Sequence, residues 1–134
     1  MRDARAHDAV PATRAVAGAF ALDAVLVVLF AATGRASHDE QAFGLGLWQT
    51  AWPFLAGLAL GWLVTRAWLA PRAPVRTGLG VWAVTLAGGM LLRAVSDQGT
   101  APPFVVVAAI VLFALLVGWR AVVRGIRSRR RRHR

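Results

Sequence analysis

The chain has 134 residues, of which 57% are hydrophobic and only 16% charged. Soluble domains carry about a quarter charged residues, so this composition excludes an ordinary water-facing surface. All 16 basic residues are arginine and give a net charge of +10, but they cluster between long uncharged stretches. That distribution does not fit the basic face of a nucleic-acid-binding fold, so no nucleic-acid partner is expected. The sequence holds no cysteine, which excludes disulfides and zinc–thiolate sites.

Four apolar stretches are long enough for membrane helices, because about 20 mostly apolar residues cross a hydrocarbon core of roughly 30 Å. The sequence therefore predicts an all-α fold, an integral membrane four-helix bundle over residues 15–120. The expected spans are about 15–33, 45–68, 77–93 and 102–119. Residues 1–14 are expected to be a basic N-terminal segment, and residues 121–134 an arginine-rich tail.

The positions of the arginines predict the orientation of the bundle. All but Arg35 and Arg93 precede the first span, lie around the connection between the second and third spans, or follow the fourth. Positive residues stay cytoplasmic, so both termini are predicted to lie inside, in the cell (inner or plasma) membrane. Lysine and tyrosine are absent beside abundant alanine and arginine, which suggests a GC-rich bacterial genome.

Residues 1–36 also offer a rival interpretation as a cleaved signal peptide. An arginine-rich start and an apolar stretch precede the small residues on either side of Arg35. The apolar stretch is longer than a typical signal core, and Asp23 lies in its middle. A first membrane helix is therefore the preferred interpretation.

Tryptophans mark several span ends. Trp48, Trp68 and Trp119 lie there, where an indole keeps its N–H in water and its rings in lipid. Trp62 and Trp82 lie deeper, so we expect them to need a packing partner inside the bundle.

Short internal matches suggest that the chain contains a repeat. In chain order they pair residues 35–41 with 93–98, residues 50–54 with 100–104, and residues 61–62 with 118–119. A true duplication predicts two helical hairpins that are parallel repeats about an axis along the membrane normal. Two outer loops that merely share turn-forming residues would give the same matches.

Asp23 is the most informative single residue, because a carboxylate near the bilayer centre costs about 3 kcal/mol on insertion scales. It shares a helical face with small residues such as Ala19 and Ala31, so that face is expected to pack against protein. Thr85 lies equally far from the inner end of its own span and is the predicted hydrogen-bond partner. No arginine is expected at this depth. Two interpretations stay open: a proton or cation site, and a neutral packing residue.

Small residues and a proline predict a helix-packing seam. Pro53, Gly57 and Gly61 recur at four-residue spacing in the second span, and Gly88 and Gly89 are adjacent in the third. Small residues let membrane helices approach closely. The alternative is a kink at Pro53 that opens a cavity.

Charged residues also gather in the two predicted outer loops. We expect Arg35 and Arg93 to pair with Asp39 and Asp97 across these loops, at about 1 kcal/mol or less for each exposed pair. His38 and Asp39 are adjacent in sequence, and no second histidine lies on this face to complete a metal site. The sequence therefore predicts no catalytic, metal or cofactor site.

The C-terminal arginines have helical spacing. Arg120, Arg124, Arg127 and Arg131 would form one basic stripe if the fourth helix continues past Trp119. Anionic lipid head groups are the expected partner, at roughly 1 kcal/mol for each arginine near the surface.

Several of these segments carry a resemblance to a known family. They are Asp23, residues 34–38, residues 52–57, residues 88–93 and residues 100–104. With them the chain resembles, over roughly residues 18–120, the domain of unknown function 3054 family of small prokaryotic membrane proteins. The resemblance implies a multi-helix membrane core and no particular activity.

Three classes of function stay open. The preferred one is an uncharacterised multi-pass membrane protein with a non-enzymatic structural, assembly or interaction role, acting as a homo-oligomer. The first alternative is a small-solute, ion or proton transporter that uses Asp23. The second is a membrane enzyme, for which the sequence offers no nucleophile, metal cluster or phosphate-binding loop.

Overall fold

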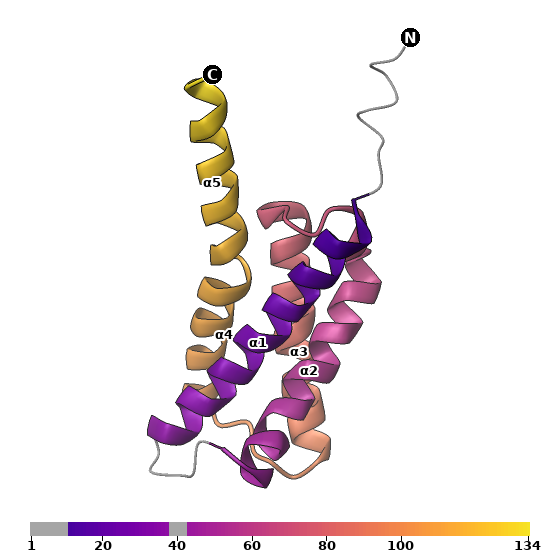
Figure 1. Cartoon of the computed structure of the whole chain (residues 1–134). Coiled ribbons are helices and arrows are strands. Elements are labelled where there is room, and N and C mark those ends of the chain that lie inside the picture. Colours follow the sequence, from indigo (N-terminus) through magenta and orange to yellow (C-terminus); the bar gives the residue numbers. More distant parts are fainter. Residues whose placement is uncertain (1–10, 38–42) are drawn as a thin grey trace.

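The computed structural model describes residues 11–37 and 43–134 of the chain, and its regular structure there is entirely helical. The elements in order are α1 Thr13–Ser37, α2 Leu45–Thr65, the 3-10 turn η1 Ala67–Leu69, the π-helical segment η2 Pro74–Leu79, α3 Gly80–Val95, α4 Pro102–Leu116 and α5 Gly118–Arg132 (Figure 1). The predicted all-α class is confirmed.

Four helical segments are long and apolar enough to cross a membrane. They are Thr13–Ala36, Leu45–Thr65, Pro74–Val95 and Pro102–Arg132. At about 1.5 Å per residue, even the shortest reaches the roughly 30 Å of a hydrocarbon core. The chain is therefore a multi-pass membrane protein built as a four-helix bundle.

Three boundaries differ from the predicted ones. The second helix ends at Thr65, before residue 68, because Arg66 adopts a left-handed conformation with φ of 51°. The third span begins at Pro74, where the π-helical turns of η2 lead directly into α3. The fourth helix does not stop near residue 119: α5 extends α4 to Arg132, so the predicted tail is part of the same long helix.

Glycines allow α2 and α3 to lie in close contact. A Cβ atom on Gly57 would lie 2.8 Å from the carbonyl oxygen of Thr85, and one on Gly61 would lie 3.2 Å from that of Val81. A Cβ atom on Gly88 would lie 3.2 Å from the Cα atom of Gly57. Any larger residue would push the two backbones apart, as expected for membrane helices that pack through small residues.

Gly89 belongs to the same contact, because the ring of Phe54 fills the space beside it. Pro53 is buried inside α2, which continues through it as one helix. The remaining helices are added around this central pair, with α1 packed on α2 and α4, and α4 packed on α3.

The two ends of the bundle differ in composition. One end, here called the terminal end, holds the start of α1, the connection from Arg66 to Leu79, and α5, which extends beyond the other helices (Figure 1). The other end, the opposite end, has an aromatic cluster in which the ring centroid of Phe30 lies 5.3 Å from that of Phe54 and 6.4 Å from that of Phe104. Large apolar side chains such as Leu60, Leu91 and Ile110 cover the outside, where lipid would contact them.

Candidate functional site

Asp23 lies on the face of α1 that packs into the bundle. Ala19, Asp23, Val27 and Ala31 recur at four-residue spacing, and all four are buried, Asp23 completely. The small residues on either side of Asp23 let α1 approach its neighbours, so the carboxylate is surrounded by protein.

The partner of Asp23 is Arg120, in the first turn of α5. Its Nη1 donates to Asp23 Oδ1 at 2.9 Å, and its Nη2 donates to Asp23 Oδ2 at 2.6 Å. Both side chains have 0% exposure. This bidentate geometry is the strongest arrangement of an arginine and a carboxylate. It connects residues that lie far apart in the sequence.

Two indoles complete the environment of the carboxylate. Trp62 Nε1 in α2 donates to Asp23 Oδ2 at 2.9 Å, and Trp119 Nε1 in α5 donates to Asp23 Oδ1 at 2.8 Å. Each carboxylate oxygen therefore accepts one guanidinium and one indole hydrogen bond. The two Gly-Trp segments of the suggested repeat thus converge on one carboxylate, while the duplication itself stays a prediction.

The other donors of Arg120 bind backbone carbonyls. Its Nε donates to Pro71 O at 2.8 Å, and its Nη1 also donates to Leu116 O at 2.7 Å. Pro71 lies in the connection between α2 and α3, where the Thr77 hydroxyl also donates to Ala70 O at 2.5 Å. Through these contacts, the Asp23–Arg120 pair joins α1, α2, this connection, α4 and α5.

This geometry corrects the expectation that no arginine lies near Asp23. A guanidinium contacts both carboxylate oxygens, and each oxygen also accepts a hydrogen bond from an indole N–H. That expectation came from counting residues along each span, which takes no account of the tilt of a helix or the length of an arginine side chain. In the structure α1 crosses the bundle obliquely (Figure 1), and the long side chain of Arg120 is buried among the helices.

Thr85 is not the hydrogen-bond partner of Asp23. Its side chain is completely buried, and its hydroxyl has no hydrogen-bond partner within residues 11–37 and 43–134. Thr85 lies instead against Gly57, at the contact between α2 and α3. The prediction failed because Arg120 and the two indoles already donate to both oxygens of the carboxylate.

Arg93 at the opposite end does not pair with Asp97 as predicted. Its Nη2 donates to Gln98 O at 2.8 Å, its Nε donates to Gly99 O at 3.1 Å, and its guanidinium lies 4.4 Å from the ring centroid of Phe104. The left-handed residues Asp97 and Gly99 turn the chain back so that these carbonyls reach Arg93. Arg93 therefore stabilises the loop that follows it, and the carbonyls of that loop take the place of a carboxylate as its hydrogen-bond acceptors.

Arg35 also faces this end. Its Nη1 donates to Thr50 Oγ1 at 3.1 Å, and together with Arg93, Gln98 and other polar residues it lines a cavity of about 510 Å³. His38 and Asp39, which were predicted to act in the same loop, lie outside the described residues. No group of three or more His, Asp or Glu side chains suited to a metal ion occurs in the described ranges.

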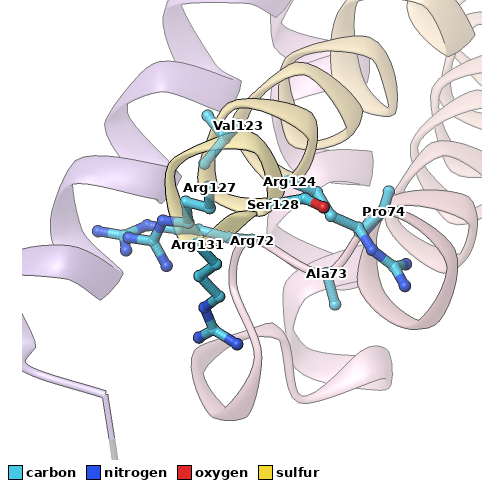
Figure 2. A pocket seen from close by; sticks show the side chains of 8 residues that line it. All are labelled: Arg72, Ala73, Pro74, Val123, Arg124, Arg127, Ser128 and Arg131. Atoms are coloured by element: carbon cyan, nitrogen blue, oxygen red, sulfur yellow. The ribbon is translucent and has the colours of Figure 1, made fainter. Parts of the chain in front are cut away.

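The C-terminal stripe is divided between two environments. Arg120 was predicted to contact lipid head groups with Arg124, Arg127 and Arg131, but it is completely buried on Asp23. The other three are exposed and line a cavity of about 410 Å³. Its walls are Val123, Arg124, Arg127, Ser128 and Arg131 from α5, and Arg72, Ala73 and Pro74 from the connection between α2 and α3 (Figure 2). We call this cavity the basic pocket.

Sequence reasoning missed the two indole donors and the pairing of Arg120. One signal was present, because an ionisable residue inside a membrane span is expected to find a charged partner in the bundle. Trp62, too deep for the membrane interface, was a second signal, since a buried indole N–H needs an acceptor.

Comparison with known proteins identifies a family for the chain. The family model described as "Protein of unknown function (DUF3054)" matches residues 20–123, which include Asp23, both indole donors and Arg120. No curated protein and no solved structure matches the chain. The match covers well over half of the sequence, so the chain belongs to this family of proteins of unknown function.

Proposed function

We propose that this protein is a non-enzymatic component of the bacterial cell membrane, whose bundle holds the basic helix α5 at the cytoplasmic surface as an assembly or interaction element. The observation that carries the proposal is the Asp23–Arg120 pair. It fixes the first turn of α5 to α1 and to the carbonyl of Pro71, and it leaves the later arginines of α5 facing outward.

The orientation rests on charge. The start of α1 and the whole of α5 lie at the same end of the bundle, as an even number of crossings requires (Figure 1). Arg66, Arg72 and Arg76 lie at this end too, whereas Arg35 and Arg93 lie at the other. The positive-inside rule then favours a cytoplasmic terminal end.

The environment of Asp23 favours a structural role over a proton site. A proton site must exchange its proton during function, whereas protonation of Asp23 would leave the buried guanidinium of Arg120 without a counter-charge. Four donors also occupy the two carboxylate oxygens. The pair is therefore better suited to fixing helices than to exchanging protons.

Spin labels can test whether the pair fixes α5. The chain has no native cysteine, so cysteines introduced at the exposed positions Ala17 and Ile126 would be the only labelling sites. We expect a narrow distance distribution between the labels, and a broad one after Asp23→Asn or Arg120→Gln. Arg129→Gln, on the opposite face of α5, is the matched control and should leave it narrow. Equal distributions in all four proteins would contradict the proposal.

The second candidate is a proton-coupled transporter, because an ionisable residue inside the membrane is by default a functional hypothesis. Reconstituted vesicles with an imposed pH gradient separate the two candidates. The structural role predicts the same proton leak for the parent protein and for Asp23→Asn. A flux that is present in the parent and lost in Asp23→Asn, with the fold intact, would favour transport.

A further inference from the structure

The basic pocket concentrates positive charge without a partner in the described chain. Arg72, Arg124, Arg127 and Arg131 make no side-chain hydrogen bond or ion pair within residues 11–37 and 43–134. The acidic residues in these ranges are Asp23, which is engaged by Arg120, and Asp97, which lies at the opposite end. Guanidinium groups that share a pocket repel one another, so a bound anion would be stabilised there.

Arg72 and Arg127 are the centre of this arrangement. Both line the basic pocket, and both also line an adjoining cavity of about 300 Å³ that reaches Pro11 and Ala15 beside the start of α1. Figure 2 shows Arg72, Arg127 and Arg131 on one side of α5, and Arg124 with Pro74 on the other. A ligand between Arg72 and Arg127 would therefore be held by two elements that are distant in sequence.

The two elements are held in a fixed relation by Arg120. Its Nε donates to the carbonyl of Pro71, the residue directly before Arg72, while Arg127 follows it two helical turns later on the same face of α5. A Cβ atom on Gly78 would lie 3.3 Å from Arg120 Cδ, so this glycine lets η2 approach the base of α5. The positions of Arg72 and Arg127 are thus set before any ligand arrives, which lowers the entropic cost of binding.

From this arrangement we infer that the basic pocket is a binding site for a phosphate group, held between Arg72 and Arg127 with Arg131 as a further donor. A planar guanidinium can donate two parallel hydrogen bonds to phosphate oxygens. No carboxylate of the described residues lines the pocket, so these donors are available to a phosphate group. The site lies just beyond the buried Arg120, where the other helices of the terminal end stop, so a lipid head group or a soluble phosphate compound could reach it (Figure 1).

This inference rests on the proposed function, because it requires α5 to be fixed beside the connection from Arg66 to Leu79. It also makes a further prediction. In a tail that binds anions through charge alone, every arginine contributes equally to binding, whereas in a specific site only the arginines that line the pocket contribute strongly.

The test is native mass spectrometry of the full chain in detergent, with phosphatidic acid as the anionic lipid, phosphatidylcholine as the zwitterionic lipid and inorganic diphosphate as competitor. We expect retention of phosphatidic acid over phosphatidylcholine. Arg72→Gln and Arg127→Gln should each weaken retention about tenfold, since a charge-assisted hydrogen bond is lost. Arg129→Gln makes the same charge change outside the pocket and should have less than about a twofold effect.

The competitor identifies the source of the phosphate. Displacement of the lipid by diphosphate assigns the site to soluble phosphate compounds, and retention in its presence assigns it to a lipid head group; both outcomes support the site. Equal losses for Arg72→Gln and Arg129→Gln, or no preference for phosphatidic acid, would overturn it. Arg72 and Arg127 have no partner to lose within the described ranges, so both variants should fold like the parent. Equal losses with narrow spin-label distances would reject the site alone, whereas broad distances in the parent protein would reject the proposed function.

Discussion

Arginines near the two ends of the bundle have different partners, although both contact helices of the membrane domain. Arg120 binds a carboxylate 97 positions away in the sequence, two backbone carbonyls and the face of Trp119. Arg93 binds carbonyls five and six positions away in its own loop and stacks on Phe104. Burial explains the difference. A completely buried charge needs a counter-charge, whereas a partly exposed one is stabilised by carbonyl dipoles, an aromatic ring and solvent.

The comparison also separates tertiary from local roles. The contacts of Arg120 join α1, α4 and the connection between α2 and α3, so its loss should affect several helices of the bundle. The contacts of Arg93 stabilise only the connection between α3 and α4, so the loss of Arg93 should affect mainly that connection.

Replacing Asp23 by Ala should have the largest effect. Arg120 would stay buried without its counter-charge, and we expect the free energy of unfolding to fall by about 3–5 kcal/mol. Unfolding of the detergent-solubilised protein by added SDS measures this change. A loss below about 1 kcal/mol, the value typical of exposed pairs, would show that the carboxylate is not the counter-charge.

Removing one indole donor should have a smaller effect. Trp62→Phe and Trp119→Phe each delete a hydrogen bond to a charged acceptor, which contributes about 1.5–3 kcal/mol to stability. The matched control is Trp82→Phe, because Trp82 Nε1 donates at 2.9 Å to the neutral carbonyl of Ala109. A neutral hydrogen bond contributes about 0.5–1.5 kcal/mol, so the control should cost less in the same SDS titration. Equal losses in the three variants would argue against a charged acceptor.

The glycine seam should respond to added volume. Gly57→Leu places a side chain where the backbone of Thr85 lies, and such overpacking costs about 1–3 kcal/mol. Gly18→Leu is the control, because a Cβ atom at Gly18 meets nothing within 4 Å. Thermal unfolding in detergent should show a lower midpoint for Gly57→Leu only. A similar midpoint for the two variants would mean that α2 and α3 are not in close contact.

Arg93→Gln should have the smallest effect on global stability. Gln cannot reproduce the contacts to Gln98 and Gly99, but these contacts are partly exposed, so we expect a loss of about 1 kcal/mol or less. Hydrogen exchange should become faster in the connection between α3 and α4 and stay unchanged around Asp23. Faster exchange throughout the bundle would contradict the local role of Arg93.

The sequence was sufficient to predict the fold because the governing signals are local. Apolar length determines a membrane span, and the small residues Gly57, Gly61, Gly88 and Gly89 are visible in the sequence as a packing face. Element boundaries were less predictable, since the left-handed Arg66 and the π-helical start of the third span depend on surrounding packing.

The candidate site was only half predictable, for a physical reason. Asp23 can be recognised from the sequence without knowledge of its partner, because any carboxylate inside an apolar span costs free energy. Its partner depends on the tilt of α1 and on the direction in which the Arg120 side chain extends, and neither follows from residue spacing. The arginine stripe of α5 has helical spacing along its whole length, yet it includes one buried member and several exposed ones. Only the tertiary arrangement distinguishes them.

The most direct measurement is a double-mutant cycle on the Asp23–Arg120 pair. It compares the unfolding free energies of the parent protein, Asp23→Asn, Arg120→Gln and the double variant. Asn keeps the shape of Asp, and Gln keeps a polar but uncharged side chain in place of Arg. If the pair is a buried structural interaction, each single variant is strongly destabilised, and the double variant is less destabilised than the sum by about 1–3 kcal/mol. Single variants that are near neutral, with effects that add to within about 0.5 kcal/mol, would contradict the account.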